Sequence, residues 1–414
     1  MSKKYKVLYI HHDGNISGSA ISLLNILKFL DRQIFTPFVI LGSYGPLKEL
    51  YERMGIEVHI IPLKLFSTSP GFKWNKLSFY KNWFALLPNK KLRDLINLVN
   101  PDIIHINDKS ILVAGIESRM FGVPIIWHVR SSYFPSKSKF QAKASCWIIK
   151  KLATELIVIS EDEMDGFEDL ANATIIHNSV DFSESKQAIE NREKTRKELG
   201  LSQNDLAIGT ITTTINEVRG TWDFINASGI IKRKFNETSI KFYVTAKIPP
   251  KKENHKKKLF FKEINLHPYD QAFKLVNDNN LSSIFTFTGY RSDPLNIMAA
   301  MDIVVICNRH GVLGRMPFEA MSVGTPIVAT TGHSGKSNVV INYESGILVK
   351  PADPESIAEG VTRLISDRNL REKISKNGKI SVINYFNPKL NIQKIQSIYN
   401  NVLTQSDQTE NYEK

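Results

Sequence analysis

Short apolar runs that alternate with helical patterns are the feature that most constrains how this chain can fold. Between the runs lie stretches with the periodicity of an amphipathic helix, such as residues 19–30, where Ser22, Asn25 and Lys28 form a polar stripe. Apolar strands joined by helices are typical of parallel, doubly wound sheets. The runs of the first half are KVLYIHH, FTPFVILG, IEVHIIPL, DIIHIND, PIIWHVR and ELIVIS.

A second series of the same kind follows a charged segment at residues 181–200. Its apolar runs are LAIGTIT, IKFYVTA, IFTFTG, DIVVIC, TPIVAT and GILV. The repeated pattern predicts an α/β chain with two similar domains, a linker, a final helix and a polar tail that we expect to be disordered. The expected boundaries are residues 1–183 for the first domain, 184–204 for the linker, 205–385 for the second domain, 386–404 for the helix and 405–414 for the tail.

Composition and charge narrow the possible classes of protein. The 414 residues carry a formal net charge of +13, and the two cysteines, Cys146 and Cys307, lie in separate apolar segments. The sequence contains neither a run of about 18 apolar residues nor a secretory signal. We therefore expect a cytoplasmic protein without disulfides, whose charge favours anionic partners. Nucleic acid is not an expected partner, because the sequence has no zinc-finger, helix-turn-helix or RNP-type signature.

Two long segments combine cations with aromatic residues and contain no acid. They lie between Val58 and Arg93 and between Ser118 and Thr154. One interpretation is a surface that binds the acceptor of a reaction and makes peripheral contact with the inner face of an anionic plasma membrane. The other is a set of ordinary helices with solvated lysines and core aromatic side chains. We favour the first, and its candidate residues are Lys73, Trp74, Arg130 and Lys137.

Polar motifs in the first half follow the expected strands, at the edge where open α/β sheets bind ligands. The segment HDGNISGSA leads from a strand into a helix, and Gly18 lies in the turn, where backbone amides favour an anion. The run DIIHIND carries His105, and the run PIIWHVR carries His128 and Arg130. Two cationic or aromatic motifs in the second half have similar positions: Arg219-Gly220 before a helical pattern, and Tyr290-Arg291 after IFTFTG.

The segment RHGVLGRMPFEAMSVGTPIVAT, at residues 309–330, places one carboxylate just inside a helix behind a glycine loop. Gly314 permits a close approach between the backbone and a phosphate. The amides of Arg315 and Met316 would open the helix that receives that phosphate. Glu319 is the carboxylate, and one interpretation is simply an acid that the helix dipole stabilises.

In this order the motifs resemble those of the retaining GT-B glycosyltransferases of the family 4 type, which include many bacterial lipopolysaccharide, capsule and exopolysaccharide enzymes. The resemblance covers roughly residues 6–403. It implies two doubly wound Rossmann-like domains that face each other across a cleft. It also implies transfer of a sugar, with retention, from a nucleotide-diphosphate sugar to a glycan or lipid-linked acceptor, without a metal or other cofactor.

The resemblance also implies roles for individual residues. His128 matches the family position that faces the transferred sugar, and Glu319 matches the glutamate that hydrogen-bonds the donor ribose, so these two are the candidate catalytic residues. The candidate donor-binding residues are Gly18, Arg219, Tyr290, Arg291, Gly314, Arg315, Met316 and Glu319.

The sequence departs from the family pattern at several of these positions. Gly311 stands where the family has its first glutamate, Ser19 replaces a glycine, and threonines between Thr210 and Thr214 replace an arginine that holds the diphosphate. An alternative is therefore a GT-B-like partner subunit that binds nucleotide with little or no transferase activity. A sugar-nucleotide 2-epimerase shares the fold but matches the motifs less well.

Overall fold

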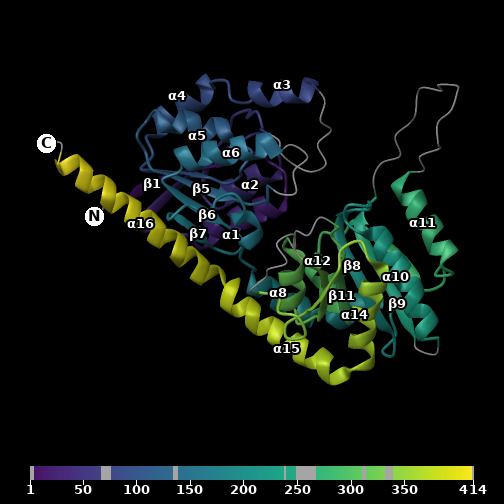
Figure 1. Cartoon of the computed structure of the whole chain (residues 1–414). Helices are drawn as coiled ribbons and strands as arrows, with labels where there is room; N and C mark the ends of the chain where they lie inside the picture. Colours follow the sequence, from purple (N-terminus) through teal and green to yellow (C-terminus); the bar gives the residue numbers. More distant parts are fainter. Residues whose placement is uncertain are drawn as a thin grey trace. The chain divides into compact units, whose positions relative to one another are not determined.

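The computed structural model describes residues 4–66, 76–133, 139–236, 239–248, 267–309, 314–331 and 339–412. It divides into two compact units (Figure 1). The first unit comprises Met1–Ser179 together with Phe386–Lys414, and the second comprises Val180–Tyr385.

The first unit is built on a seven-stranded parallel sheet with the order β3-β2-β1-β4-β5-β6-β7. Its strands are β1 (Tyr5–His11), β2 (Phe35–Leu41), β3 (Glu57–Ile60), β4 (Ile103–Ile106), β5 (Ile125–Val129), β6 (Glu155–Val158) and β7 (Ala173–Ile175). Its helices are α1 (Gly18–Phe29), α2 (Pro46–Arg53), α3 (Lys76–Phe84), α4 (Lys90–Val99), α5 (Leu112–Arg119), α6 (Lys139–Leu152), α7 (Glu161–Met164) and α16 (Pro388–Tyr412).

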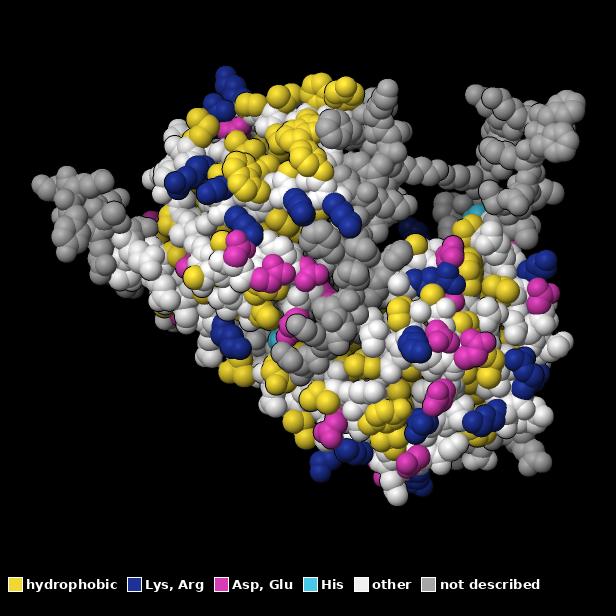
Figure 2. Space-filling model, viewed as in Figure 1, with side chains coloured by type: hydrophobic (Ala, Val, Ile, Leu, Met, Phe, Trp, Pro, Cys, Tyr) yellow, Lys and Arg dark blue, Asp and Glu magenta, His cyan; other side chains and the backbone are white. Residues whose placement is uncertain are grey.

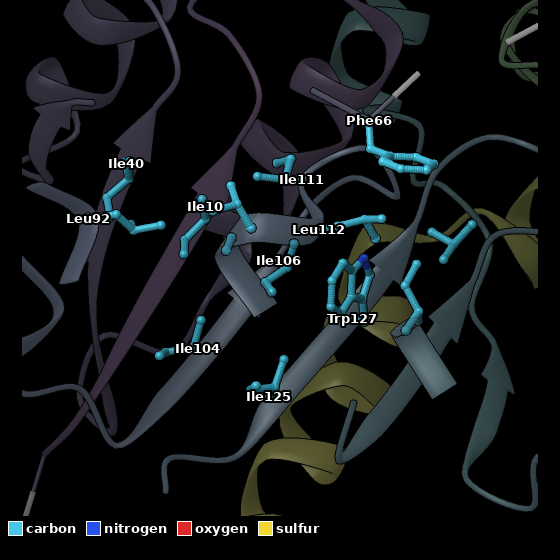
Figure 3. Packing of buried hydrophobic residues seen from close by; sticks show 14 of the residues in the cluster. Ile10, Ile40, Phe66, Leu92, Ile104, Ile106, Ile111, Leu112, Ile125 and Trp127 are labelled. Atoms are coloured by element: carbon cyan, nitrogen blue, oxygen red, sulfur yellow. The ribbon is translucent and has the colours of Figure 1, made fainter. Parts of the chain in front are cut away.

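Helices cover both faces of this sheet, which explains why its central strands are buried along their whole length. Every residue of β4 and β5 is buried. Alternate residues serve different cores: Ile104 and Ile106 pack on one face and Ile103 on the other. Figure 3 shows the first of these cores, in which Trp127 of β5 packs near Leu112 of α5.

The second unit repeats the architecture with a six-stranded parallel sheet in the order β10-β9-β8-β11-β12-β13. Its strands are β8 (Leu206–Thr214), β9 (Ile240–Lys247), β10 (Phe285–Gly289), β11 (Ile303–Ile306), β12 (Ile327–Thr330) and β13 (Ile347–Val349). Its helices are α8 (Phe182–Glu190), α9 (Arg192–Glu198), α10 (Thr221–Lys234), α11 (Pro268–Asp278), α12 (Pro294–Ala300), α13 (Met316–Ser322), α14 (Pro354–Ser366) and α15 (Arg368–Tyr385). The two doubly wound parallel sheets confirm the fold class expected from the sequence.

Two segments differ from the expected organisation. Residues 184–204, expected as a linker, form most of α8 and all of α9, and both helices pack on α12 within the second unit. The tail expected to be disordered continues α16 as far as Tyr412. Polar composition suggested disorder, but residues 405–412 contain no proline or glycine that would end a helix.

The last helix, α16, packs against the first unit although it follows the second unit in the sequence (Figure 1). Its Gln396 accepts a hydrogen bond from the backbone N–H of Asp31 at 2.9 Å. Its Asn391 donates to the backbone carbonyl of His177, also at 2.9 Å. Its Tyr399 is fully buried and meets Phe35 of β2 edge-on. The first unit therefore contains residues from both ends of the chain.

A buried arginine fixes α9 to the second unit. The Arg196 guanidinium donates to Asp302 Oδ2 at 3.1 Å and to the backbone carbonyls of Ala300, Ser202 and Asp205 at 2.9, 3.2 and 2.7 Å. Only 7% of its side chain is exposed. The bonds to Ala300 and Asp205 are buried, so loss of the guanidinium would leave these two carbonyls without that donor.

We therefore expect Arg196→Met to lower the free energy of unfolding by about 3 kcal/mol, the usual cost of breaking a buried charge pair. Urea denaturation followed by circular dichroism would measure the change. Arg368→Met is the matched control, since Arg368 is 81% exposed and its ion pair among the described residues is with Glu372 on the same helix. Equal denaturation midpoints for the two variants would contradict this account.

Candidate functional site

The strand order of each sheet reverses at one point, and the carboxyl ends of the strands there form the ligand-binding edge of such folds. In the first unit the reversal lies between β1 and β4, and in the second between β8 and β11. In the first unit, β1 ends at His11 and leads to Gly18, while Asn107 follows β4. Gly18 is exposed as the first residue of α1, where Ser17 caps the helix through the N–H of Ala20.

Asn107 and Arg130 join the strands at this edge of the first unit. Asn107 Nδ2 donates to His11 Nδ1 at 3.1 Å and to the carbonyl of Ser19 at 3.3 Å. Its Oδ1 accepts from Arg130 Nε at 2.9 Å, and Arg130 Nη1 donates to Asn178 Oδ1 at 2.7 Å. Arg130, expected on an acceptor or membrane face, instead ties β5 to β4 and to the segment after β7.

His11, His12 and Asp13 bring three potential metal ligands within 4.8 Å of one another. The Asn107 amide occupies His11 Nδ1 as a donor, so neutral His11 carries its proton on Nε2, the nitrogen 3.8 Å from Asp13. That nitrogen then has no lone pair for a metal. Burial and the neighbouring His12 lower the pKa of His11 to about 4, which keeps it neutral near pH 7. His11 therefore does not fit the role of a metal ligand here.

His128 lies on β5 and is buried within a row of hydrogen-bonded side chains. Its Nδ1 is 3.3 Å from His105 Nε2, and His105 Nδ1 is 2.7 Å from the Tyr399 hydroxyl. Burial and the charge of Arg130 lower the pKa of His105 to about 3 and hold that of His128 well below its ordinary value. Both histidines are consequently neutral near pH 7.

His128 also lines a small pocket of the first unit, together with polar residues of α1, the segment after β7 and α16. Among the described residues, none forms a hydrogen bond with the buried His128 Nε2. The pocket residues with polar side chains are Ser22, Asn25, His128, Arg130, His177, Asn178, Ser179 and Asn391.

In the second unit, Arg219 lies at the strand-order reversal, just before α10. Gly220 caps α10 with a left-handed backbone (φ +70°), and a side chain there would collide with the carbonyl of Cys307, directly after β11. The chain must therefore have a glycine where the ends of β8 and β11 meet. Burial lowers the pKa of the Arg219 guanidinium, and within the described ranges no side chain or backbone group pairs with it.

Two buried hydroxyl groups lie near Arg219 in the sequence and also lack partners in the part of the chain that the structure describes. Thr212 is near the end of β8, and Thr221 is the first residue of α10. The sequence suggested hydroxyls between Thr210 and Thr214 as substitutes for a missing arginine. The sequence offers no clear signal for Thr221, because threonine is common at helix starts as a local cap.

Arg309, in contrast, is already neutralised by acids of the second unit. Its Nε and Nη2 donate to the two oxygens of Asp223 at 2.6 and 2.7 Å, and it also pairs with Glu217. The backbone N–H of Arg309 donates to Val218 at 3.1 Å. Arg309 therefore fastens the loop after β11 to the start of α10. Gly311, where the family has a glutamate, lies outside the described residues.

Glu319 is in the first turn of α13, and Arg315 is its partner. Arg315 Nε donates to Glu319 Oε1 at 3.0 Å, and the two side chains are 13% and 16% exposed. Gly314 has a φ of +63° with open space around it, so the glycine is needed for the backbone conformation. Met316 is the first residue of α13.

Tyr290 and Arg291 follow β10, which β9 separates from β8 in the sheet. Tyr290 is 73% exposed. Arg291 forms ion pairs with Asp293 at 2.7 Å and Glu198 at 3.3 Å, which raise the pKa of its guanidinium. The Tyr290 ring is therefore accessible to a ligand, whereas the neighbouring Arg291 is already paired with two carboxylates.

The expected acceptor or membrane face is described only in part, since Lys73, Trp74 and Lys137 lie outside the described residues. On α6, Lys143, Trp147 and Lys151 follow at intervals of four and are exposed. Other exposed apolar side chains nearby in the sequence are Tyr80, Trp83, Phe84, Leu87 and Phe140.

Two aromatic residues of the acid-free segments, Phe66 and Tyr133, are instead fully buried in the core. Asn82 of α3 donates to Gln141 of α6 at 3.3 Å, so these two helices are neighbours. Figure 2 shows hydrophobic side chains gathered around α3 and α4, with Lys and Arg beside them. Within the described part of the chain, no helix is both long and apolar enough to cross a bilayer.

Comparison with known proteins connects this arrangement to one enzyme family. Residues 16–184 match the model described as "Glycosyltransferase Family 4", and residues 250–381 match "Glycosyl transferases group 1". HepE of Anabaena, solved in complex with UDP, superimposes with a TM-score of 0.76 at 20% identity over 96% of this chain and 100% of that one. The likeness confirms the GT-B fold.

Two curated relatives show how far the sequence similarity extends. The capsular polysaccharide biosynthesis glycosyltransferase CapM of Staphylococcus aureus is 33% identical over 28% of this chain and 30% of its own length. The UDP-Gal:alpha-D-GlcNAc-diphosphoundecaprenol alpha-1,3-galactosyltransferase of Escherichia coli is 22% identical over 96% of this chain and 97% of its own. The stronger match therefore spans less than a third of the relative, and the full-length match has low identity.

The neutral buried histidines predict an acid-sensitive first unit. Because the folded state holds the pKa of His105 near 3, the unfolded chain binds a proton below pH 6.5 that the folded chain does not bind. Stability is therefore fully present above about pH 6.5 and falls by about 1.4 kcal/mol per pH unit for this residue as the pH drops toward 4. Denaturant unfolding between pH 7 and pH 4 would measure the slope.

His105→Gln should reduce that slope by the contribution of one proton. The matched control is Tyr51→Phe, which alters another buried polar group of the same unit. Burial raises the pKa of Tyr51 far above this window, so the control should keep the slope of the wild type. An identical slope in His105→Gln and the wild type would show that His105 does not take up a proton on unfolding.

Proposed function

Because the chain belongs to the GT-B glycosyltransferases of the family 4 type, we propose that it transfers a sugar from a nucleotide-diphosphate sugar to a glycan or lipid-linked acceptor. The process would be bacterial cell-surface polysaccharide biosynthesis, which the names of CapM and of the lipopolysaccharide core enzyme LpsE of Rhizobium meliloti support. HepE was solved in complex with UDP and with UDP-glucose, and a uridine diphosphate sugar is therefore the first donor to test.

The unneutralised Arg219 is the observation that carries this proposal. A partly buried cation without a counter-charge among the described residues is costly unless an anion from outside the chain pairs with it. It lies at the start of α10, where unpaired backbone N–H groups add a positive potential. The buried hydroxyls of Thr212 and Thr221 can donate to phosphate oxygens. We therefore propose that a diphosphate pairs with Arg219 and that these hydroxyls contribute to its binding.

Glu319 would bind the ribose of the same nucleotide. Its Oε1 is held by Arg315, and this ion pair fixes the direction of the carboxylate. No described donor lies at Oε2, which is therefore available to accept a ribose hydroxyl. Gly314 and Met316 would bring backbone N–H groups to the diphosphate, and the exposed Tyr290 would pack on the base.

The transfer itself would depend on electrostatic stabilisation of the leaving diphosphate. As the bond between the anomeric carbon and the phosphate oxygen breaks, Arg219 would stabilise the growing negative charge. The acceptor hydroxyl would attack from the same face, so that configuration is retained, and its proton would pass to the departing diphosphate. We propose no metal, since the proton on His11 Nε2 faces Asp13 and removes a ligand from the cluster at β1.

We further propose that the exposed aromatic and basic side chains of α3 and α6 bind an anionic membrane, where a lipid-linked acceptor would reside. Exposure of Trp147 and Phe140 favours an interfacial role over a core role. Lys143 and Lys151 flank Trp147 one helical turn away on each side, which suits anionic headgroups around an inserted indole.

Arg219→Gln should weaken binding of the matching nucleotide by about 10- to 100-fold, because it removes a charge-assisted contact worth about 1.5–3 kcal/mol. Thermal shifts with UDP-, GDP-, dTDP- and CMP-sugars would first identify the nucleotide, and calorimetry would then measure affinity. Arg233→Gln, at the exposed opposite end of α10, is the control and should bind like the wild type. Unchanged affinity in Arg219→Gln would refute the diphosphate site.

The same experiment separates the enzyme from the alternative, a partner subunit. Gly311 in place of the family glutamate is the feature that favours the alternative. A wild type that binds a nucleotide sugar tightly but neither hydrolyses nor transfers the sugar would support the partner subunit. Turnover that is lost in Arg219→Gln would support the enzyme.

Flotation with vesicles that contain or lack an anionic lipid would test the membrane surface. We expect the double variant Lys143→Glu with Trp147→Ser to bind anionic vesicles about tenfold more weakly, from the lost charge attraction and apolar insertion. Lys376→Glu with Ile380→Ser, at the same spacing on exposed α15 of the second unit, is the matched control. Equal flotation of both variants, or wild-type protein that fails to float at low salt, would contradict the proposed membrane surface.

A further inference from the structure

The row of side chains that ends at His128 has a definite proton arrangement. It begins at Tyr9 of β1, where the Tyr399 hydroxyl donates to the Tyr9 hydroxyl at 3.2 Å. Since Tyr399 gives its only proton to Tyr9, its oxygen must accept the 2.7 Å hydrogen bond from His105 Nδ1. His105 is therefore the tautomer with its proton on Nδ1.

The same reasoning extends to His128. With its proton on Nδ1, neutral His105 has a lone pair on Nε2, which accepts the 3.3 Å hydrogen bond from His128 Nδ1. Neutral His128 then carries its proton on Nδ1 and a lone pair on Nε2. That Nε2 is the buried atom without a described partner, in a residue that lines the pocket.

Burial keeps the row from changing its total charge. Tyr9, His105, His128 and Tyr399 are each at most 1% exposed. The tyrosine hydroxyls hold their protons because burial raises their pKa, and the histidines remain neutral because burial lowers theirs. The hydrogen bonds therefore all donate in one direction, from His128 toward Tyr9, and all four side chains are neutral.

We propose that Tyr399, from the C-terminal helix, and His105 are positioning residues that fix His128 as a hydrogen-bond acceptor at Nε2. The group that His128 would accept from is a hydroxyl, either of the sugar in the reaction or of a water that bridges to it. This role rests on the proposed function, whereas the tautomer itself is a property of the first unit alone.

Two substitutions should reverse the row without removing a ring. In Tyr9→Phe, the Tyr399 hydroxyl loses its acceptor and donates to His105 Nδ1 instead, so His105 donates from Nε2 and the proton of His128 moves to Nε2. In Tyr399→Phe, His105 Nδ1 loses its acceptor, and the same reversal becomes favourable. His128 would then present a donor to the hydroxyl.

Selective ¹⁵N labelling of histidine in the full chain, with long-range ¹H–¹⁵N correlation spectra, would report the tautomer of His128 directly. We expect the proton on Nδ1 in the wild type and on Nε2 in Tyr9→Phe and Tyr399→Phe. Tyr51→Phe is the control: it removes another buried hydroxyl of the same unit, one that has no partner among the described residues. It should preserve the wild-type spectrum.

Turnover of the nucleotide sugar provides the second readout. Tyr9→Phe and Tyr399→Phe should lower kcat about tenfold or more with little change in nucleotide affinity, while Tyr51→Phe should match the wild type. A wild-type His128 with its proton on Nε2 would overturn the inference, whatever the activity. The expected spectra together with full activity in His128→Ala would instead overturn the proposed contact between His128 and the sugar.

Discussion

The reversal of strand order between β1 and β4, and again between β8 and β11, is the constraint on which the rest of the molecule depends. Neighbouring strands whose connections leave in opposite directions leave an edge that no crossover helix covers. Side-chain hydrogen bonds join the segments at each of these edges. Asn107 and Arg130 form them in the first unit, and Arg309 and Asp223 form them in the second. The candidate binding residues His128 and Arg219 belong to the same two regions as these hydrogen bonds.

Charge balance distinguishes the groups that build the molecule from those available to a ligand. Arg196 and Arg309 are cations whose donors are taken up by acids or carbonyls of the second unit. Arg219 is in a comparable environment but has no such partner in the described part of the chain. Sequence alone does not separate these arginines, because the acidic partners of Arg196 and Arg309 lie 106 and 86 residues away in the chain. The arginines differ in whether folding places an acidic side chain beside the guanidinium.

The sequence was sufficient for the fold because the core strands are mostly apolar and helical periodicity lies between many of them. It was also sufficient to place Gly18, His128, Arg219 and Glu319 at strand ends or helix starts. It missed Asn107, although a polar residue after a strand at the reversal point was a usable signal. It could not reveal Tyr399, which lies 294 residues from His105 and reaches it only because α16 returns to the first unit.

The packing of α16 on the first unit affects the order in which the protein can fold during synthesis. A ribosome releases the sheet of the first unit long before it synthesises α16, yet Tyr399 and Ile395 belong to a core that this sheet requires. Until α16 has been synthesised, the surface of β1 and β2 that it covers remains exposed to water and to other nascent chains. The residues of the second unit are contiguous, so this unit is synthesised in full before α16. The first unit is completed only when α16 has been synthesised.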